Sequence, residues 1–218
     1  MRLLTAAAIA AFSLAALPAH ALVIDDFNDG TSFNVVPGNP GPTNVASVSA
    51  IGGSRTMFVE ATSSDGTTLA STGSTLDHGQ TTQGPGSSSV TWDANGVGLG
   101  GIDLTDGGAA TQVRITVLSI DVGNVDLALE VTDTGAQMST LALTGLNVGT
   151  FGFDFASFVG TADLTAVDSI KLIIAAGTNS DVSLDLVETN RRVSEPGMLA
   201  LAGAGLIGGA IVTRRRRQ

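Results

Sequence analysis

Residues 112–133, QVRITVLSIDVGNVDLALEVTD, decide the fold. Two runs in which apolar and polar side chains alternate stand on either side of a short turn, Asp121–Asn124. The second run, VDLALEV at 125–131, shows this repeat of two most clearly. Such a repeat places the apolar residues on one face of an extended strand. We therefore predict β-strands over 112–120 and 125–132, each with one face in the core.

The same pattern recurs outward from this stretch. Short runs rich in Val, Ile and Thr are separated by Gly, Asn and Asp, as is typical of strands and turns. Further strands are predicted near 22–27, 45–51, 55–62, 88–93, 137–144, 149–155, 167–175 and 182–187. Together they predict one all-β domain over 22–190, an antiparallel β-sandwich or jelly roll. The chain has no cysteine, so this domain must be stable without disulfide bonds.

One internal stretch differs in composition. Residues 62–89, TSSDGTTLASTGSTLDHGQTTQGPGSSS, are mainly Ser, Thr and Gly, with few apolar side chains. Such a stretch buries too little apolar surface to offset the entropy that is lost on ordering. We therefore predict a mobile loop over 62–89.

The C-terminal segment, 191–218, has the features of a membrane tether. Sixteen uncharged residues, Met198–Thr213, precede four arginines, Arg214–Arg217. As a helix, the uncharged residues would span about 24 Å, less than the ~30 Å hydrocarbon core of a bilayer. We predict a single hydrophobic helix that holds the membrane weakly. Its orientation would be set by the cytoplasmic side chains of Arg214, Arg215, Arg216 and Arg217, which leaves the β domain outside.

This segment resembles the PEP-CTERM sorting signal of Gram-negative bacteria that make exopolysaccharide. The parts of that signal occur in order: a short motif (Ser194, Glu195, Pro196), an apolar helix and an arginine run. A serine stands where the motif has its first proline. The resemblance implies recognition by an exosortase, a membrane peptidase that removes the tail. It also implies an inner-membrane-tethered precursor and a product at the cell surface or in the extracellular matrix.

The N-terminus indicates the same route. Met1-Arg2 supplies positive charge, Leu3–Leu17 an apolar core, and Ala19-His20-Ala21 a cleavage site with small residues. We predict a signal peptide over 1–21, read by the export machinery, and a mature chain that begins at Leu22.

Residues 22–190 are strongly acidic. They hold three basic residues, Arg55, Arg114 and Lys171, against 19 acidic ones, so their net charge is −16, whereas the whole chain carries −10. Binding to a nucleic-acid backbone requires clustered Lys and Arg, so we exclude nucleic acid as a partner. Divalent cations and neutral or cationic polymers are compatible with this charge, which also favours solubility.

Stretches near both ends of the domain carry a fainter resemblance. The start of the domain, Leu22–Phe27, is similar to the first strand of galactose-binding-like jelly rolls. Its later part is similar to the end of that fold, over Phe155–Phe158, Ala162–Leu172 and Asp181–Glu188. This is the fold of many carbohydrate-binding modules, so the resemblance supports the jelly-roll prediction.

That resemblance also implies a structural calcium near the terminal strands, which often pair in a jelly roll. Asp25, Asp26 and Asp185 are the candidate ligands, because calcium takes several carboxylate and carbonyl oxygens. The alternative is that Asp25 and Asp26 are solvated or turn residues.

Features of a catalytic site are scarce. The one histidine of 22–190, His78, falls within the predicted loop, a poor platform for a general base. No Gly-x-Ser-x-Gly motif surrounds a serine, and no carboxylate pair stands out for glycoside hydrolysis. We predict that the protein is not an enzyme and assign no catalytic residue.

Sugar binding has a candidate residue. Trp92 is the only tryptophan, and with Asp93 and Asn95 it is a possible platform for a sugar ring. A lone tryptophan at a strand end is more often part of the core.

The sequence therefore predicts an exported surface or extracellular-matrix protein. It would be a structural component associated with exopolysaccharide or biofilm, processed at its C-terminus by an exosortase. The alternative is a carbohydrate-binding module for matrix polysaccharide.

Overall fold

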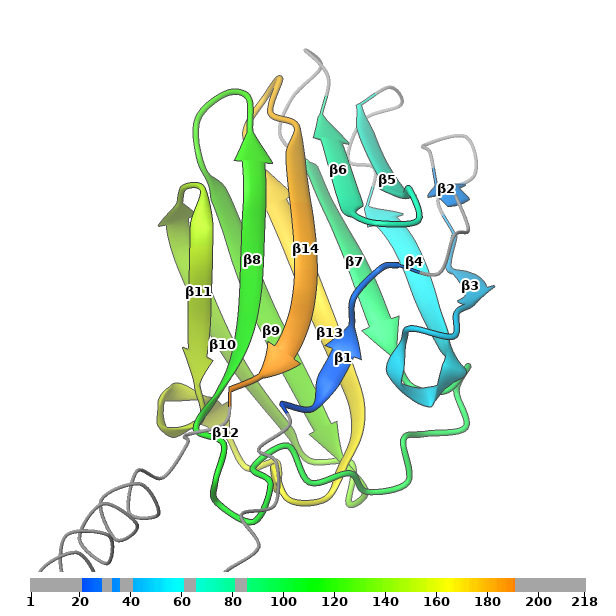
Figure 1. Ribbon diagram of the computed structural model, residues 1–218, viewed down its shortest axis with the longest axis vertical. Coiled ribbons are helices and arrows are strands. Elements are labelled where there is room, and N and C mark those ends of the chain that lie inside the picture. The colour runs from blue at the N-terminus through cyan, green and yellow to red at the C-terminus, as the bar shows by residue number, and fades with distance from the viewer. Residues whose placement is uncertain (1–20, 29–32, 36–40, 61–65, 81–85, 191–218) are drawn as a thin grey trace, which may run out of the picture. The chain divides into compact units, whose positions relative to one another are not determined.

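In the part of the chain that the structure describes, two antiparallel β-sheets of seven strands each face one another (Figure 1). The computed structural model describes residues 21–28, 33–35, 41–60, 66–80 and 86–190, which belong to one unit, Ala21–Arg192. The all-β prediction is confirmed: apart from two short 3-10 turns, η1 (Ile51–Gly53) and η2 (Phe155–Ser157), the regular structure of these residues is strand.

The front sheet, nearest the viewer in Figure 1, has the order β11-β8-β14-β6-β5-β2, and β1 also pairs with β14. Its strands are β1 (Val23–Asp25), β2 (Phe33–Val35), β5 (Thr67–Ser71), β6 (Leu76–Gln80), β8 (Gln112–Ile120), β11 (Gly149–Asp154) and β14 (Val182–Thr189).

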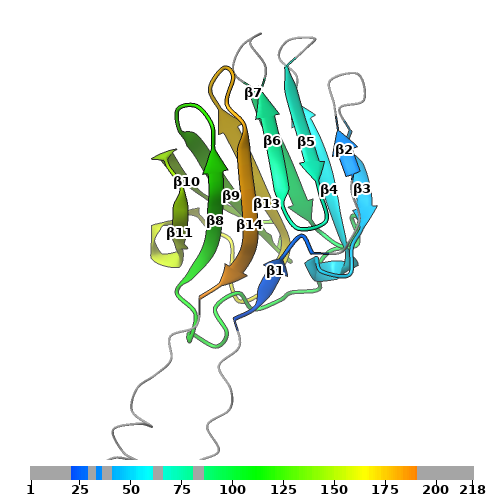
Figure 2. The same ribbon diagram turned by 45° about the horizontal axis from the view of Figure 1, so that its top comes forward.

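The back sheet has the order β12-β10-β9-β13-β7-β4-β3. Its strands are β3 (Thr43–Ala46), β4 (Ser54–Glu60), β7 (Gly86–Trp92), β9 (Val125–Asp133), β10 (Met138–Leu146), β12 (Val159–Gly160) and β13 (Val167–Ala176). Both sheets are visible again from a second direction in Figure 2.

The core lies between the sheets. On β9 the apolar residues of the alternating run are fully buried: Val125, Leu127, Leu129 and Val131. Val113 and Ile115 of β8 are fully buried as well. The two predicted strands are thus confirmed, and the turn over 121–124 leads from the front sheet to the back sheet.

The predicted mobile loop over 62–89 is wrong for much of its length. It contains β5, β6 and the first residues of β7. Leu69 of β5 and Leu76 of β6 point inward and are fully buried. Inward-facing polar side chains bond to one another, as where Thr67 Oγ1 donates to Gln80 Oε1 at 2.6 Å. A strand can therefore form from a Ser/Thr/Gly composition because its buried polar groups find partners.

The predicted strand over 45–51 is shorter than expected. β3 ends at Ala46, and η1 follows over Ile51–Gly53. Gly52 and Gly53 have φ values of 75° and 76°. Residues that carry a side chain rarely adopt this left-handed backbone conformation, so the two glycines favour a turn that redirects the chain into β4.

Both predicted targeting segments fall largely or wholly outside the described residues. Residues 1–20 of the signal peptide and the whole of 191–218 are in this position, so the sorting motif, the hydrophobic helix and the arginine run remain sequence predictions. Within the described ranges, no helix has the length and hydropathy needed to cross a membrane.

Candidate functional site

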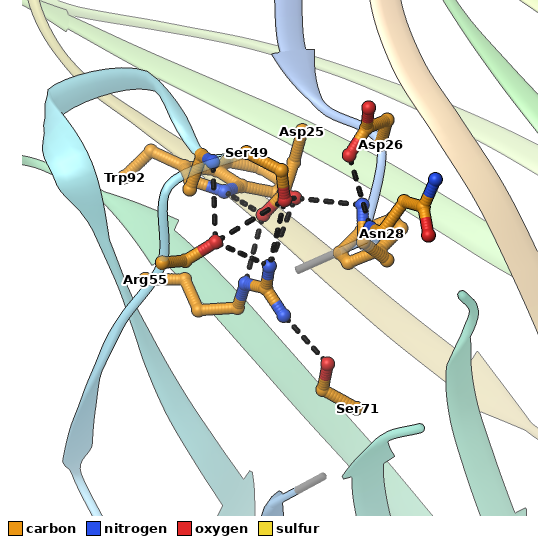
Figure 3. A network of polar contacts seen from close by, with 10 residues as sticks. Asp25, Asp26, Asn28, Ser49, Arg55, Ser71 and Trp92 are labelled. Carbon is orange, nitrogen blue, oxygen red and sulfur yellow. Dashed lines mark hydrogen bonds and ion pairs between the residues drawn. The ribbon is translucent and has the colours of Figure 1, made fainter. Parts of the chain in front are cut away.

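Asp25 and Arg55 form an ion pair inside the sandwich (Figure 3). Asp25 ends β1 of the front sheet and Arg55 lies on β4 of the back sheet, and both are fully buried. Arg55 Nε is 2.9 Å from Asp25 Oδ2, and Arg55 Nη2 donates to Asp25 Oδ1 at 3.0 Å. Two parallel contacts of this kind fix both position and orientation.

Further groups surround this pair. Trp92 Nε1 donates to Asp25 Oδ2 at 2.8 Å, and the amide of Phe27 donates to Oδ1 at 2.9 Å. Arg55 Nη1 donates to Ser71 Oγ at 2.6 Å, and its guanidinium carbon lies 5.1 Å from the centroid of the Phe27 ring. Burial raises the pKa of the Asp25 carboxyl, while Arg55 and Trp92 act to lower it. The Asp25–Arg55 network thus joins β1 and β5 of the front sheet to β4 and β7 of the back sheet.

This arrangement corrects the predicted set of calcium ligands. The terminal strands do pair, with Asp25 opposite Val187. However, Asp25 faces the core because Arg55 supplies its positive charge there. Asp26 and Asp185 lie together at the surface, in a shallow hollow of about 380 Å³ with Asn28 and Ser74. Among the described residues, no group of three or more acidic or histidine side chains is placed to hold a metal ion.

Trp92 is fully buried, so it has no ring face to offer a sugar, and its role as an exposed platform is wrong. It ends β7, and its indole N–H is committed to Asp25. Asp93 and Asn95 lie in the turn after β7, where Asn95 is exposed with a φ of 58°. Trp92, Asp93 and Asn95 are close in sequence, but they do not form a shared binding surface because Trp92 is buried.

His78 also differs from its prediction. It lies on β6, is 1% exposed, and its Nδ1 is 2.8 Å from Ser88 Oγ of β7 in the other sheet. Burial lowers the pKa of His78 to about 4, because water no longer stabilises the charged ring. Near neutral pH the side chain is a neutral part of the core.

One exposed surface of the domain is the outward face of the back sheet, here called the outer face. Residues on it alternate with fully buried ones: Phe58 lies between Met57 and Val59, and Ile173 lies between Leu172 and Ile174. Phe58 and Ile173 are partly exposed and point away from the core.

Strand register arranges the outer face in rows across the sheet. Phe58 is opposite Ser89, Ser89 is opposite Ile173, and Ile173 is opposite Ala128. This central row runs from β4 to β9 and spans about 14 Å at the ordinary strand spacing of ~4.8 Å. It forms a strip of apolar and small side chains with one aromatic ring.

A polar row lies on each side of this strip. The upper row, toward the top of Figure 1, consists of Glu60, Ser87, Ala175 and Asp126, and the lower row consists of Thr56, Thr91, Lys171 and Glu130. Ser87 Oγ donates to Glu60 Oε2 at 3.0 Å. Lys171 Nζ is 3.5 Å from Glu130 Oε2. The strip is therefore bordered by hydroxyl, carboxylate and ammonium groups.

A hollow of about 530 Å³ adjoins the upper row, where β7 and β9 begin and β13 ends. Its lining includes the small residues Gly86, Ala175, Ala176 and Gly177 together with the polar residues Ser87, Asn124 and Asp126. Asp126 is held by the amide of Gly145, which donates to its Oδ1 at 2.8 Å. The small residues leave room for a ligand, and the side-chain amide of Asn124 and the carboxylate of Asp126 can form hydrogen bonds with its hydroxyl groups.

The strip, its polar rows and the hollow match the chemistry of a sugar chain. A pyranose ring presents C–H groups on its faces and hydroxyl groups at its edge, so it needs an apolar surface bordered by donors and acceptors. Sequence reasoning missed Phe58 because it stands in an apolar run, Met57-Phe58-Val59, that reads as continuous core. The alternation of side chains along a strand could have identified it, because it places Phe58 on the opposite face from its two buried neighbours.

Structural neighbours of this chain include carbohydrate-binding modules with a β-sandwich jelly-roll fold. One is the family 11 module from Clostridium thermocellum in complex with a β-1,3-1,4-mixed-linked tetrasaccharide, at 12% identity and a TM-score of 0.40, covering 78% of this chain and 94% of that one. A neighbour of another kind is an exo-β-agarase, at 10% identity and a TM-score of 0.44, covering 78% of this chain and 25% of that one. No protein-family model matches the chain, and no curated protein matches it in sequence. What the chain binds must therefore be argued from its own residues.

Proposed function

We propose that this chain is a carbohydrate-binding module of an exported protein, and that it binds matrix polysaccharide on the outer face. The observation that carries the proposal is the Phe58–Ile173 strip between two polar rows. An extended sugar chain would lie across the strands, with its ring faces on the strip and its hydroxyl groups toward the rows. The hollow would take one unit or a branch.

Binding of this kind involves no bond cleavage. His78 is the only histidine in 22–190, and it is buried and engaged with Ser88, away from the outer face. The proposal therefore assigns no catalytic residue.

The test is retention of the full chain by polysaccharides in affinity electrophoresis, with a panel of mixed-linkage β-glucan, xylan and galactan. Phe58→Ala should weaken retention by about tenfold, if a sugar face gains from the ring an amount at the lower end of the roughly 1–3 kcal/mol that a nucleic-acid base gains by stacking on an aromatic side chain. The matched control is Leu118→Ala, which removes an apolar side chain that is 45% exposed on the front sheet. The proposal fails if no polysaccharide retards the protein, or if Phe58→Ala and Leu118→Ala behave alike.

We also propose that both ends of the chain determine where the module acts. The support is the sequence of the ends: a signal peptide over 1–21 and a tail with Ser194-Glu195-Pro196 before its apolar and arginine segments. An exosortase would remove the tail and place the module at the surface or in the matrix. Mass spectrometry of the secreted protein should show a C-terminus near Pro196, whereas secreted protein that retains Arg214–Arg217 would contradict this route.

A further inference from the structure

The charges on the outer face are one-sided. Its central strip and two polar rows carry four ionisable side chains, of which three are carboxylates: Glu60, Asp126 and Glu130. The fourth is Lys171, which is already paired with Glu130 at 3.5 Å. A ligand on this surface therefore meets unneutralised carboxylates, above all around the hollow at the upper row.

No other cation of the domain can offset this charge. Residues 22–190 contain three basic side chains, and Arg55 is fully buried against Asp25. Arg114 lies on β8 of the front sheet and is exposed there, opposite Glu188 of β14. The outer face thus depends on Lys171 alone for positive charge, in a domain whose net charge is −16.

From these charges we infer that the outer face selects uncharged polysaccharide and rejects polysaccharide that carries carboxylate or sulfate groups. This inference rests on the proposed function, because it concerns the ligand class of the same face. Like charges placed together in an interface oppose binding, and a site discriminates as much by such repulsion as by attraction. Glu60 and Asp126 repel acidic sugars, whereas Ser87 and Asn124 can form hydrogen bonds with the hydroxyl groups of neutral sugars.

The experiment compares polymers that share a backbone and differ in charge. Hydroxyethyl cellulose is paired with carboxymethyl cellulose, and pullulan with pullulan oxidised to the uronate at C6. The full chain should bind the neutral member of a pair at least tenfold more tightly in low salt. The difference in affinity between the neutral and the anionic polymer should become smaller at about 0.5 M NaCl, because salt screens exposed charges.

Three results are distinguishable. Binding confined to the neutral members supports the inference. Equal or tighter binding of the anionic members overturns it while leaving the proposed function standing. Failure to bind any polymer, in these pairs or in the panel above, removes the proposed function and the inference with it.

Variants then locate the source of the selectivity. The double variant Glu60→Gln with Asp126→Asn should reduce the neutral-to-anionic affinity ratio several-fold, and Lys171→Met should increase it because Glu130 loses its counter-charge. The matched control is Asp77→Asn with Asp185→Asn on the front sheet, which changes net charge equally and should leave the ratio unchanged. If this control narrows the ratio as much, overall charge is responsible and the inference is wrong. The emission of the buried Trp92 verifies that each variant is folded.

Discussion

Two acid–base pairs among the described residues, Asp25–Arg55 and Glu130–Lys171, have the same chemistry but differ in burial and in distance. Asp25 and Arg55 are both 0% exposed and make contacts of 2.9 and 3.0 Å. Glu130 and Lys171 are 28% and 40% exposed and are 3.5 Å apart. The first pair joins the two sheets, whereas the second lies on the outer face among the proposed ligand-binding rows.

Burial, more than residue type, decides what a charged side chain does in this domain. A buried charge that loses its partner has no water to replace it, so the pair is costly to break. An exposed pair exchanges its partner for water at little cost, so it is free to interact with a ligand. The calcium prediction failed for Asp25 on this point, because sequence reasoning treated Asp25 and Asp26 as equivalent.

The largest expected effect is that of Arg55→Met. The variant leaves the Asp25 carboxylate buried without its counter-charge. The free energy of unfolding should therefore fall by about 3–5 kcal/mol. Removal of Arg55 also frees Ser71 from its 2.6 Å hydrogen bond. The measurement is a urea titration followed by the emission of Trp92, which contacts the same carboxylate.

The double variant Arg55→Met with Asp25→Asn gives the control. If the pair acts as a unit, the double variant should lose clearly less stability than the sum of the two single variants. Additive losses would contradict a coupled pair, and a loss below about 1 kcal/mol for Arg55→Met would contradict the role of the network in joining the sheets.

An intermediate effect is expected from the buried His78, whose Nδ1 lies 2.8 Å from Ser88 Oγ. Burial lowers the pKa of His78 to about 4 in the folded protein, from the ordinary value of 6.5 for a solvated imidazole. Between these pH values the unfolded chain binds more protons than the folded one, so stability falls as pH falls from 6.5 toward 4. The loss attributable to His78 amounts to about 3 kcal/mol, from ~1.4 kcal/mol for each pKa unit.

The measurement is the free energy of unfolding at pH 7, 5.5 and 4.5, for the full chain and for His78→Gln. The difference between the two proteins should shrink or reverse as the pH falls, since the variant has no imidazole to protonate. Parallel curves for the two proteins would show that the pH dependence arises elsewhere, in carboxylates.

Strand alternation accounts for how much of the fold could be predicted. The strands over 112–120 and 125–132 were predictable because apolar residues stand at alternate positions over 113–117 and 125–131, and these residues are buried. β5 and β6 were not, because composition hides a pattern in which Leu69 and Leu76 share the inward face with polar groups that pair inside the core. A composition argument treats each Ser or Thr as solvated, whereas a sandwich allows it a partner on the neighbouring strand.

The candidate site was less predictable than the fold. Phe58 and Arg55 occupy the same strand on opposite faces, and the sequence Arg55-Thr56-Met57-Phe58-Val59 contains this parity. The alternation does not say which face of the strand points inward. Arg55 shares its face with Met57 and Val59, and a charged residue suggests that this face is exposed, whereas it is buried. The partner that makes Arg55 tolerable inside, Asp25, lies 30 residues away in sequence. Pairings over such separations are set by sheet topology, which local patterns do not encode.

The smallest expected effect on stability is that of Lys171→Met, at the exposed pair. Its pair with Glu130 is partly solvated and 3.5 Å apart, so its loss should change the free energy of unfolding by less than about 1 kcal/mol. The same substitution should still alter the neutral-to-anionic affinity ratio, because binding depends on the local charge of the outer face. Arg55→Met should show the reverse pattern, with a large loss of stability and no specific change in that ratio for the protein that remains folded. A stability loss of 3 kcal/mol or more for Lys171→Met would place both pairs in the same structural role and remove the distinction between interior network and binding face.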